Sequence, residues 1–275
     1  MIAVTKINKD LFRNLQIAVA LYLSKCLPEK KIILDEKKLL AQFALHRGKI
    51  KNCTPNGVLM PKRHLILEYN IIIQAYAAIL KSLGISEFIE SILLNIRYKD
   101  AEEIKGNRER SYPTEEPHTD AWVGQQLNTL TVITPIFGDA ENNRVDYFRL
   151  PDDFKDEWLA PLPTFASGRS IADKCRRLKI PFQKGKMYLT DISVVHGSVR
   201  EPGAGARVSI DAALIVKKLE NEKNPGLELP NNMLISFETF CTIGENNLFV
   251  FTDSEDRQSG SSDFTVVKLQ EDRNG

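Results

Sequence analysis

The order of helical and strand patterns along the chain constrains its fold more than any other feature of the sequence. Apolar residues recur at helical spacing in the first third, which predicts helices around Leu11–Tyr22, over Lys37–Leu45 and over His64–Leu83. Gly84 stands where a helix would end, and a short helix is expected at Ser86–Ser91. Later segments rich in Thr, Val and Ile predict strands. These strands are expected at Leu93–Tyr98, Leu127–Phe137, Arg144–Leu150, Lys186–Leu189, Val194–His196, Ala206–Val216, Met233–Thr242, Asn247–Thr252 and Phe264–Leu269.

Helices followed by strands predict an α+β protein, in which the strands form a barrel or sandwich and the early helices pack on its outside. The length of 275 residues and the 43% of hydrophobic residues suit one domain with a real core. We expect a single domain over residues 1–275: mainly helical support in 1–92, a β-core in 93–216, and strands that complete the sheets in 217–275. The proline-containing stretch Pro151–Lys179 is expected to be an insertion with one short helix.

Charge and cysteine usage narrow the class of protein. The chain has 37 basic and 36 acidic residues, so its net charge of +1 gives no bulk signal for nucleic acid or for an anionic membrane. The four cysteines form no CxxC pair and are expected to be reduced thiols. No signal peptide and no run of ~18 apolar residues stands out. We expect a cytoplasmic protein, either a monomer or a homo-oligomer.

Two histidines and one aspartate stand out among the residues that carry chemistry. His118 and Asp120 are two positions apart, so on a strand both side chains would face the same side. His196 follows 76 residues after Asp120, at the end of another predicted strand. Two histidines and one carboxylate on one face of an octahedron suit an iron(II) oxygenase and leave three positions open. A zinc hydrolase uses similar ligands but normally keeps one water position open.

A second candidate binding motif begins eleven residues after His196. Arg207 and Ser209 share one face of a predicted strand whose other residues are mostly apolar. A buried guanidinium requires an anion, and together with a hydroxyl it can grip a carboxylate in bidentate fashion. A dicarboxylate such as 2-oxoglutarate would chelate the metal at its keto-acid end and contact Arg207 at the other. The alternative for Arg207 is a structural ion pair with Asp211.

The ordered set of His118, Asp120, His196, Arg207 and Ser209 resembles the iron(II)- and 2-oxoglutarate-dependent dioxygenases. The stretch Gly185–Asp191 looks like the approach strand of that family, and the resemblance spans roughly Leu93–Val216. The sequence of Pro117–Gln125 looks closest to the phytanoyl-CoA-type and streptomycin-biosynthesis-type hydroxylases. The resemblance implies a double-stranded β-helix, that is, a cupin-like jelly-roll barrel. It also implies Fe(II), 2-oxoglutarate and O2 as cofactor and co-substrates, with the metal held by His118, Asp120 and His196.

The activity that the resemblance implies is hydroxylation of an unactivated C–H bond, with release of succinate and CO2. The substrate would be a small molecule: a sugar, an aminocyclitol, an amino acid or a natural-product intermediate. Asp120 argues against halogenation, because halogenating members carry a small residue at that position. Desaturation, epimerisation and ring closure stay open. The rival hypothesis is a cupin-like barrel that binds a metal or a sugar without oxidative chemistry.

Six further residues are candidates for ligand contacts. Thr129 and Thr131 share one face of a predicted strand, and one of them is expected to bind the keto-acid end of the co-substrate. The candidates for substrate binding are Trp122, Gln125, Arg97 and Arg200. Plain core packing is the alternative for Trp122, and an ordinary ion pair is the alternative for Arg97.

Overall fold

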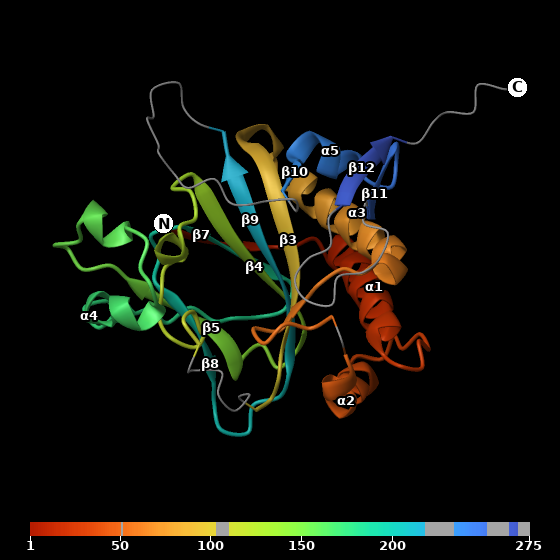
Figure 1. Ribbon diagram of the computed structural model, residues 1–275, viewed down its shortest axis with the longest axis horizontal. Helices are drawn as coiled ribbons and strands as arrows, with labels where there is room; N and C mark the ends of the chain where they lie inside the picture. The colour runs from red at the N-terminus through yellow and green to blue at the C-terminus, as the bar shows by residue number, and fades with distance from the viewer. Residues whose placement is uncertain (51, 103–109, 218–233, 252–263, 269–275) are drawn as a thin grey trace, which may run out of the picture.

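The computed structural model describes residues 1–50, 52–102, 110–217, 234–251 and 264–268. It consists of a helical layer, a large antiparallel sheet and a small antiparallel sheet (Figure 1). The helices are α1 (Lys9–Cys26), α2 (Glu36–Leu45), α3 (Ile66–Ser82), α4 (Arg169–Ala172) and α5 (Phe237–Thr242). Short 3-10 helices lie at Arg47–Lys49, Arg63–Leu65, Ser86–Phe88, Asp120–Val123, Asp156–Leu159 and Phe165–Gly168. A mixed protein with antiparallel sheets, as the sequence predicts, is therefore confirmed.

The large sheet has the strand order β1-β7-β4-β9-β3-β10, with β2 paired to β3. Its strands are β1 (Ile2–Lys6), β2 (Val58–Leu59), β3 (Ile89–Lys99), β4 (Thr129–Gly138), β7 (Lys186–Asp191), β9 (Arg207–Val216) and β10 (Ile235–Ser236). The small sheet has the order β6-β5-β8, from β5 (Asn143–Arg149), β6 (Arg176–Arg177) and β8 (His196–Arg200). A separate hairpin joins β11 (Asn247–Phe251) to β12 (Phe264–Lys268).

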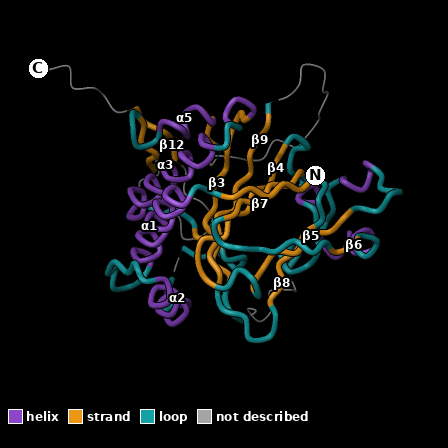
Figure 2. The backbone as a smooth tube through the Cα atoms, turned by 180° about the vertical axis from the view of Figure 1, so that it is seen from behind, coloured by secondary structure: helices purple, strands orange, loops and turns teal. Residues whose placement is uncertain are grey.

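The helical layer covers one face of the large sheet, and the small sheet lies on the other side (Figure 2). Helix α1 begins where the Asn8 side chain accepts hydrogen bonds from the backbone N–H groups of Asp10 and Leu11. Helix α3 gives way to Gly84, whose φ of +67° is the left-handed conformation that glycine adopts without strain. The main hydrophobic core joins α1 and α3 to alternate residues of β3, β4 and β9.

Strand alternation gives β9 two different faces. Val208, Ile210 and Leu214 belong to the core shared with the helices. Arg207 and Asp211 face the other way and line a cavity on the side of the small sheet. The large sheet therefore separates the core that it shares with the helices from the side that carries the cavity.

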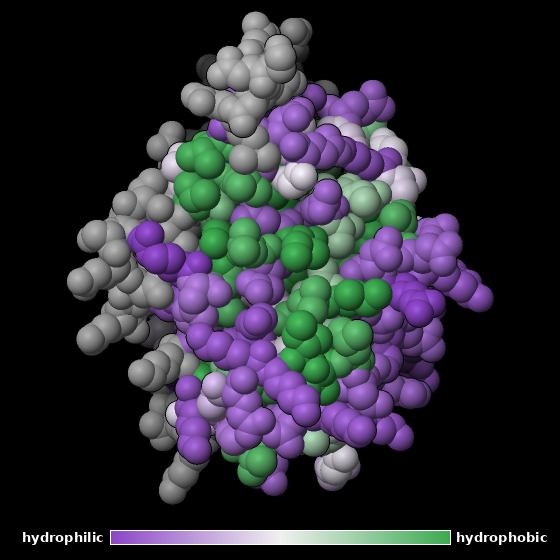
Figure 3. All heavy atoms as spheres, turned by 90° about the vertical axis from the view of Figure 1, so that its right-hand side faces the viewer, coloured by the Kyte–Doolittle hydropathy of each residue, from purple (hydrophilic) through white to green (hydrophobic). Residues whose placement is uncertain are grey.

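Figure 3 shows that apolar side chains also gather at the surface of the helical side. Leu67 and Ile71 on α3 are both exposed. None of the helices in the described ranges is long and apolar enough to span a membrane.

Most of the predicted elements exist, and the differences have local causes. The strand Ile2–Lys6 was not predicted; it pairs with β7 at the edge of the large sheet. The segment predicted as a strand over Met233–Thr242 is wrong beyond Ser236, because the Ser236 hydroxyl caps the start of α5 by accepting from the Thr239 N–H at 3.2 Å. Residue 233 itself lies outside the described residues.

Three other expectations were partly correct. The helix predicted at Ser86–Ser91 is a 3-10 helix over Ser86–Phe88, and β3 begins directly after it. The strand predicted at Arg144–Leu150 is β5, one residue earlier at both ends, and it pairs with β8 and β6 of the small sheet. Of the strands predicted in the tail, β10 joins the large sheet, whereas β11 and β12 pair with each other. The predicted ends at Thr252 and Leu269 lie outside the described residues.

Candidate metal centre

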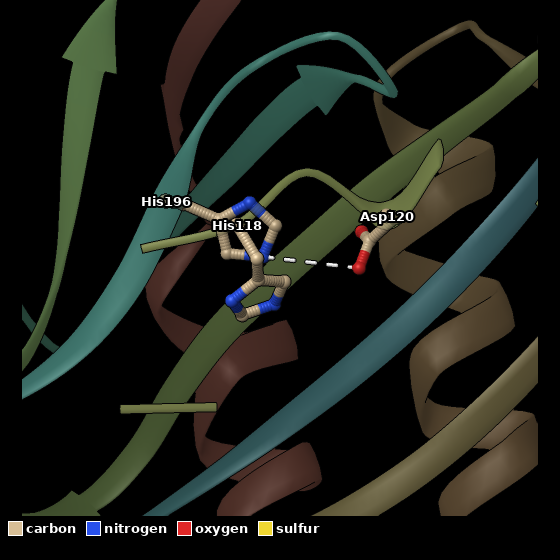
Figure 4. A group of neighbouring side chains, drawn as sticks. All are labelled: His118, Asp120 and His196. Carbon is tan, nitrogen blue, oxygen red and sulfur yellow. Dashed lines mark ion pairs between the residues drawn. The ribbon is translucent and has the colours of Figure 1, made fainter. Parts of the chain in front are cut away.

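His118, Asp120 and His196 converge at one point between the two sheets (Figure 4). Each offers one ligand atom, and the three atoms lie within 4.8 Å of one another. The His196 Nε2 lies 3.9 Å from Asp120 Oδ1. His196 begins β8, and its backbone exchanges hydrogen bonds of 2.8 and 2.7 Å with that of His118. One bridge between two distant chain segments therefore sets the spacing of the two imidazoles.

The geometry that joins His118 to Asp120 differs from the one expected. They do not occupy two positions of one strand: His118 forms an isolated β-bridge, and Asp120 begins a 3-10 helix. Thr119 makes this turn, because its hydroxyl accepts from the Ala121 N–H at 3.0 Å and donates to the Ile192 carbonyl. The two side chains still meet, but through a capped turn.

Hydrogen bonds fix which atom each ligand presents. His118 Nδ1 lies 2.6 Å from the Glu116 carbonyl, and His196 Nδ1 lies 3.1 Å from the Val194 carbonyl. A carbonyl only accepts, so both Nδ1 atoms carry hydrogen and both Nε2 atoms keep a free lone pair. The Thr131 hydroxyl donates to Asp120 Oδ2. This leaves Asp120 Oδ1 to face His196.

Burial and neighbouring groups together shift the pKa values of His118 and Asp120. His118 is 3% exposed, and burial followed by the adjacent His196 lowers its pKa to about 3. Burial alone would raise the pKa of Asp120, but His196, His118 and the Thr131 hydroxyl outweigh it and hold the pKa below its usual value. A neutral imidazole beside a carboxylate is the form in which these groups bind a divalent cation.

An aromatic ring that the sequence did not point to contacts the group. Phe165 stacks on His118 with a centroid distance of 3.9 Å and an interplanar angle of 14°. It belongs to the 3-10 helix Phe165–Gly168 within the predicted insertion. No local pattern marks this phenylalanine, because its contact depends on how the insertion folds back.

The three ligands open onto a cavity of about 130 Å³ between the sheets. Its lining mixes polar and apolar side chains, which come from β3, β4 and β9 of the large sheet, from β5 and β8 of the small sheet, and from the segment between β3 and β4. The lining residues are Leu93, Asn95, Arg97, Thr114, His118, Asp120, Gln125, Thr131, Ile133, Val145, His196, Ser198, Arg207, Asp211, Ala212 and Ala213.

Arg207 is the most deeply buried cation of the cavity, with 1% of its surface exposed. Its Nη1 donates to the Asn143 carbonyl at 2.9 Å, and its guanidinium lies 5.2 Å from the centroid of the Phe182 ring. Its Nε has no hydrogen-bond partner among the residues that the structure describes. Burial lowers the pKa of Arg207 to about 10, so the guanidinium stays charged at neutral pH. This buried charge is available for an anion.

Besides Thr131, two of the other predicted ligand-binding residues also line the cavity. Arg97 forms an ion pair with Asp211 and donates to the Asn56 carbonyl at 3.0 Å. Gln125 is the second, and its Oε1 is buried with no partner in the described part of the chain. Arg97, rather than Arg207, is thus the partner of Asp211.

The remaining predicted residues lie outside the cavity lining. The Trp122 Nε1 donates to the Trp158 carbonyl at 2.8 Å, and its ring belongs to the cluster around Phe165. Arg200 donates to the Asp100 carbonyl at 3.0 Å and lies 3.3 Å from the Glu115 carboxylate. Thr129 is buried and does not line the cavity. Ser209 is buried as well, and its hydroxyl donates to Asp211 at 2.8 Å.

Comparison with known proteins gives remote structural similarity only. No protein-family model and no curated protein matches the sequence. The chain is similar to AviO1 from Streptomyces viridochromogenes Tue57, at 13% identity and a TM-score of 0.45, over 82% of this chain and 92% of that one. It is similar to EctD from S. alaskensis with 2-oxoglutarate and 5-hydroxyectoine, at 17% identity and a TM-score of 0.40, over 84% and 77%. It is also similar to SnoK, a non-heme alpha ketoglutarate dependent carbocyclase of nogalamycin biosynthesis, at 13% identity and a TM-score of 0.38, over 79% and 95%.

Proposed function

We propose that this protein is an iron(II)- and 2-oxoglutarate-dependent oxygenase. It would hydroxylate an unactivated C–H bond of a small molecule and release succinate and CO2. The observation that carries the proposal is the group of His118, Asp120 and His196, whose ligand atoms lie within 4.8 Å of one another at a cavity that also contains the buried Arg207. Two imidazoles and one carboxylate form the ligand set of such oxygenases, and they leave three positions open.

The proposal extends to the architecture. Two antiparallel sheets face each other across the cavity, and the ligands come from the small sheet and from the turn next to it. This arrangement supports a double-stranded β-helix, with α1 and α3 packed on its outer face.

The residues present fit an iron ion and its diacid co-substrate. Both histidines present Nε2, and Asp120 presents Oδ1, so three suitable donors point to one place. Arg207, which is charged and keeps Nε unpartnered within the described residues, would hold the distal carboxylate. When bound, the iron and 2-oxoglutarate supply the activation of O2.

The protein itself supplies orientation and protection from water. Thr131 holds Asp120 in place through its hydroxyl, so we propose that it orients a ligand rather than binding the keto acid. Arg97 and Gln125 are the proposed substrate contacts, because both line the cavity. Trp122 and Arg200 are proposed to support the surrounding structure through their own hydrogen bonds.

The test measures metal binding and co-substrate turnover separately. Fe(II) and Co(II) binding is titrated for the wild-type protein, for His118→Ala and for Asp120→Ala, with the exposed His64→Ala as the matched control. Succinate release from 2-oxoglutarate is then followed in air with a panel of sugars, aminocyclitols and amino acids. Metal binding should be lost in the first two variants only, and succinate should form only with metal.

Metal binding without succinate release across the panel would support the rival, a non-oxidative cupin-like barrel. Metal binding that is unchanged in Asp120→Ala would reject the ligand set itself. Products identified by mass would separate hydroxylation, at +16 Da for an added oxygen, from desaturation or epimerisation.

A further inference from the structure

The sequence predicts that Arg207 and Ser209 together hold the distal carboxylate of the co-substrate. In the structure, the Ser209 hydroxyl already has another partner. The Ser209 hydroxyl donates its hydrogen to Asp211 Oδ1 at 2.8 Å, and Ser209 is fully buried. Asp211 also holds Arg97, so this serine belongs to an internal ion-pair network. A second donor beside Arg207 must therefore come from another residue.

Tyr147 is a buried phenol close to the same place. It is 1% exposed, and its hydroxyl has no hydrogen-bond partner within the ranges that the structure covers. It lies two positions after Val145 on β5, so the two side chains share one face of the strand; Val145 lines the cavity, and Tyr147 lies next to the lining without being part of it.

Tyr147 has neighbours at the candidate metal centre and near Arg207. Tyr147 pairs with His196 across β5 and β8, and the two ring centroids are 6.4 Å apart. Tyr147 and Phe182 also belong to one apolar cluster, and the Phe182 ring lies against the Arg207 guanidinium. Tyr147 therefore lies beside His196 and shares a cluster with the aromatic ring that lies against Arg207.

The phenol of Tyr147 is a hydrogen-bond donor at neutral pH. Burial raises the pKa of Tyr147 well above its usual value; Asp211 raises it further, and Arg207 lowers it. The phenol therefore keeps its hydrogen at neutral pH and can donate. A buried hydroxyl without a partner is costly, so it is expected where a ligand completes it.

We infer that Tyr147 donates a hydrogen bond to the distal carboxylate of the diacid co-substrate, beside Arg207 and in the role that the sequence pattern assigned to Ser209. The inference rests on the proposed function. A carboxylate accepts from several donors at once, and its two oxygens match a guanidinium N–H on one side and a phenol O–H on the other.

The test uses a ligand pair that differs only at the distal end. 2-Oxoglutarate and 2-oxopentanoate share the chelating keto acid, but the second has a methyl group in place of the distal carboxylate. Both are titrated calorimetrically into the protein loaded with Co(II), first in the wild type and then in Tyr147→Phe. We expect Tyr147→Phe to weaken 2-oxoglutarate binding about tenfold and to leave 2-oxopentanoate and Co(II) binding unchanged.

Two control variants separate this role from others. Tyr188→Phe removes a neighbouring phenol whose hydroxyl already donates to the Pro181 carbonyl at 2.6 Å, so 2-oxoglutarate affinity should stay within twofold. Ser209→Ala should also leave it within twofold. A tenfold loss in Ser209→Ala with none in Tyr147→Phe would overturn the inference.

Three further outcomes count against it in different ways. An equal loss for both ligands in Tyr147→Phe would mean that the phenol acts through the metal centre or the fold, and the inference would be wrong. If the wild-type protein binds no 2-oxoglutarate in a metal-dependent way, the proposed function fails, and this inference fails with it. Wild-type binding with an unaffected Tyr147→Phe variant would overturn the inference alone.

Discussion

The hydrogen bond from Thr131 to Asp120 decides which carboxylate oxygen faces the two histidines. Thr131 lies on β4 of the large sheet, whereas His196 begins β8 of the small sheet. Residues of this kind contact no metal, yet they fix the position of an atom that does. The neighbouring Thr129 is also buried, but its hydroxyl has no partner in the described part of the chain. The two threonines therefore form a matched pair for experiment.

We expect Thr131→Val to weaken divalent metal binding about tenfold, because loss of an outer hydrogen bond to a ligand typically costs about 10–100-fold in affinity. Thr129→Val should leave metal affinity unchanged, since the change removes an unpartnered hydroxyl and keeps the shape of the side chain. Competitive titration with a chromogenic chelator measures both. Equal losses in the two variants would mean that the strand, and not the hydroxyl, matters.

The identity of the candidate ligands could be predicted from residue type and order, because few side chains bind iron and the chain has only four histidines. The roles of Trp122 and Arg200 could not be predicted in this way. Both side chains are held by backbone carbonyls, of Trp158 and of Asp100, whose positions depend on loops with no sequence periodicity. Tyr147 was missed for a similar reason: a tyrosine on a strand looks like core until its hydroxyl is found without a partner.

The insertion after β5 is the element that most directly touches the candidate centre. It brings Phe165 onto His118 and packs Gly168 against Trp122, where an added Cβ would lie 2.4 Å from the indole ring. Trp122 lies in the 3-10 helix that Asp120 begins, so the insertion packs against that turn from outside. The sequence predicted a short helix there, which α4 provides, but not this contact.

We expect Phe165→Leu to weaken metal binding by about two- to tenfold, because an aromatic pair contributes about 0.5–1.5 kcal/mol and this one fixes the plane of the His118 ring. Phe154→Leu is the control from the same insertion; Phe154 contacts the Trp158 ring and not His118. Co(II) titration, with the visible spectrum of the bound ion, reports both affinity and ligand geometry. A spectrum and affinity equal to those of Phe154→Leu would show that the stacking has no role.

Element order was predictable, whereas strand pairing was not. The helices α1, α2 and α3 follow apolar spacing that the sequence shows directly. The pairing of β5 with β8 depends on contacts between residues about fifty positions apart, such as Tyr147 and His196. That non-local pairing brings His196 toward the cavity, so the site depends on the part of the fold that local patterns describe least.

At the scale of the whole molecule, several charged side chains are buried, and Lys99 is one of them. Lys99 on β3 is 3% exposed and forms an ion pair with Glu115 at 3.0 Å, and Glu115 also contacts Arg200. Burial lowers the pKa of Lys99 to about 7; Arg97 lowers it as well, whereas Glu115 acts in the opposite sense. Its unfolded value is 10.5, so between about pH 7 and 10.5 the unfolded chain binds more protons than the folded one.

The free energy of unfolding should therefore rise with pH through the lower part of that window, by at most about 1.4 kcal/mol per pH unit from this group. In Lys99→Met the rise between pH 7 and 8.5 should be reduced by that contribution. The range stops there because burial raises the pKa of the Cys26 thiol to about 12, which works in the opposite sense at higher pH. Urea unfolding at each pH measures the slope, and parallel slopes for the two proteins would contradict the assignment to Lys99.

A metal at the candidate centre would join three parts of the molecule: the turn with His118 and Asp120, strand β8 through His196, and β4 through Thr131. An ion that binds the folded chain and not the unfolded one stabilises it by about 2.7 kcal/mol at a concentration one hundred times its Kd. We expect Co(II) to raise the melting temperature of the wild-type protein by several degrees, and a chelator to reverse the shift. His196→Ala should melt at the same temperature with and without Co(II), while His64→Ala should respond like the wild type. A shift that persists in His196→Ala would place the stabilising ion elsewhere and separate the candidate centre from the stability of the fold.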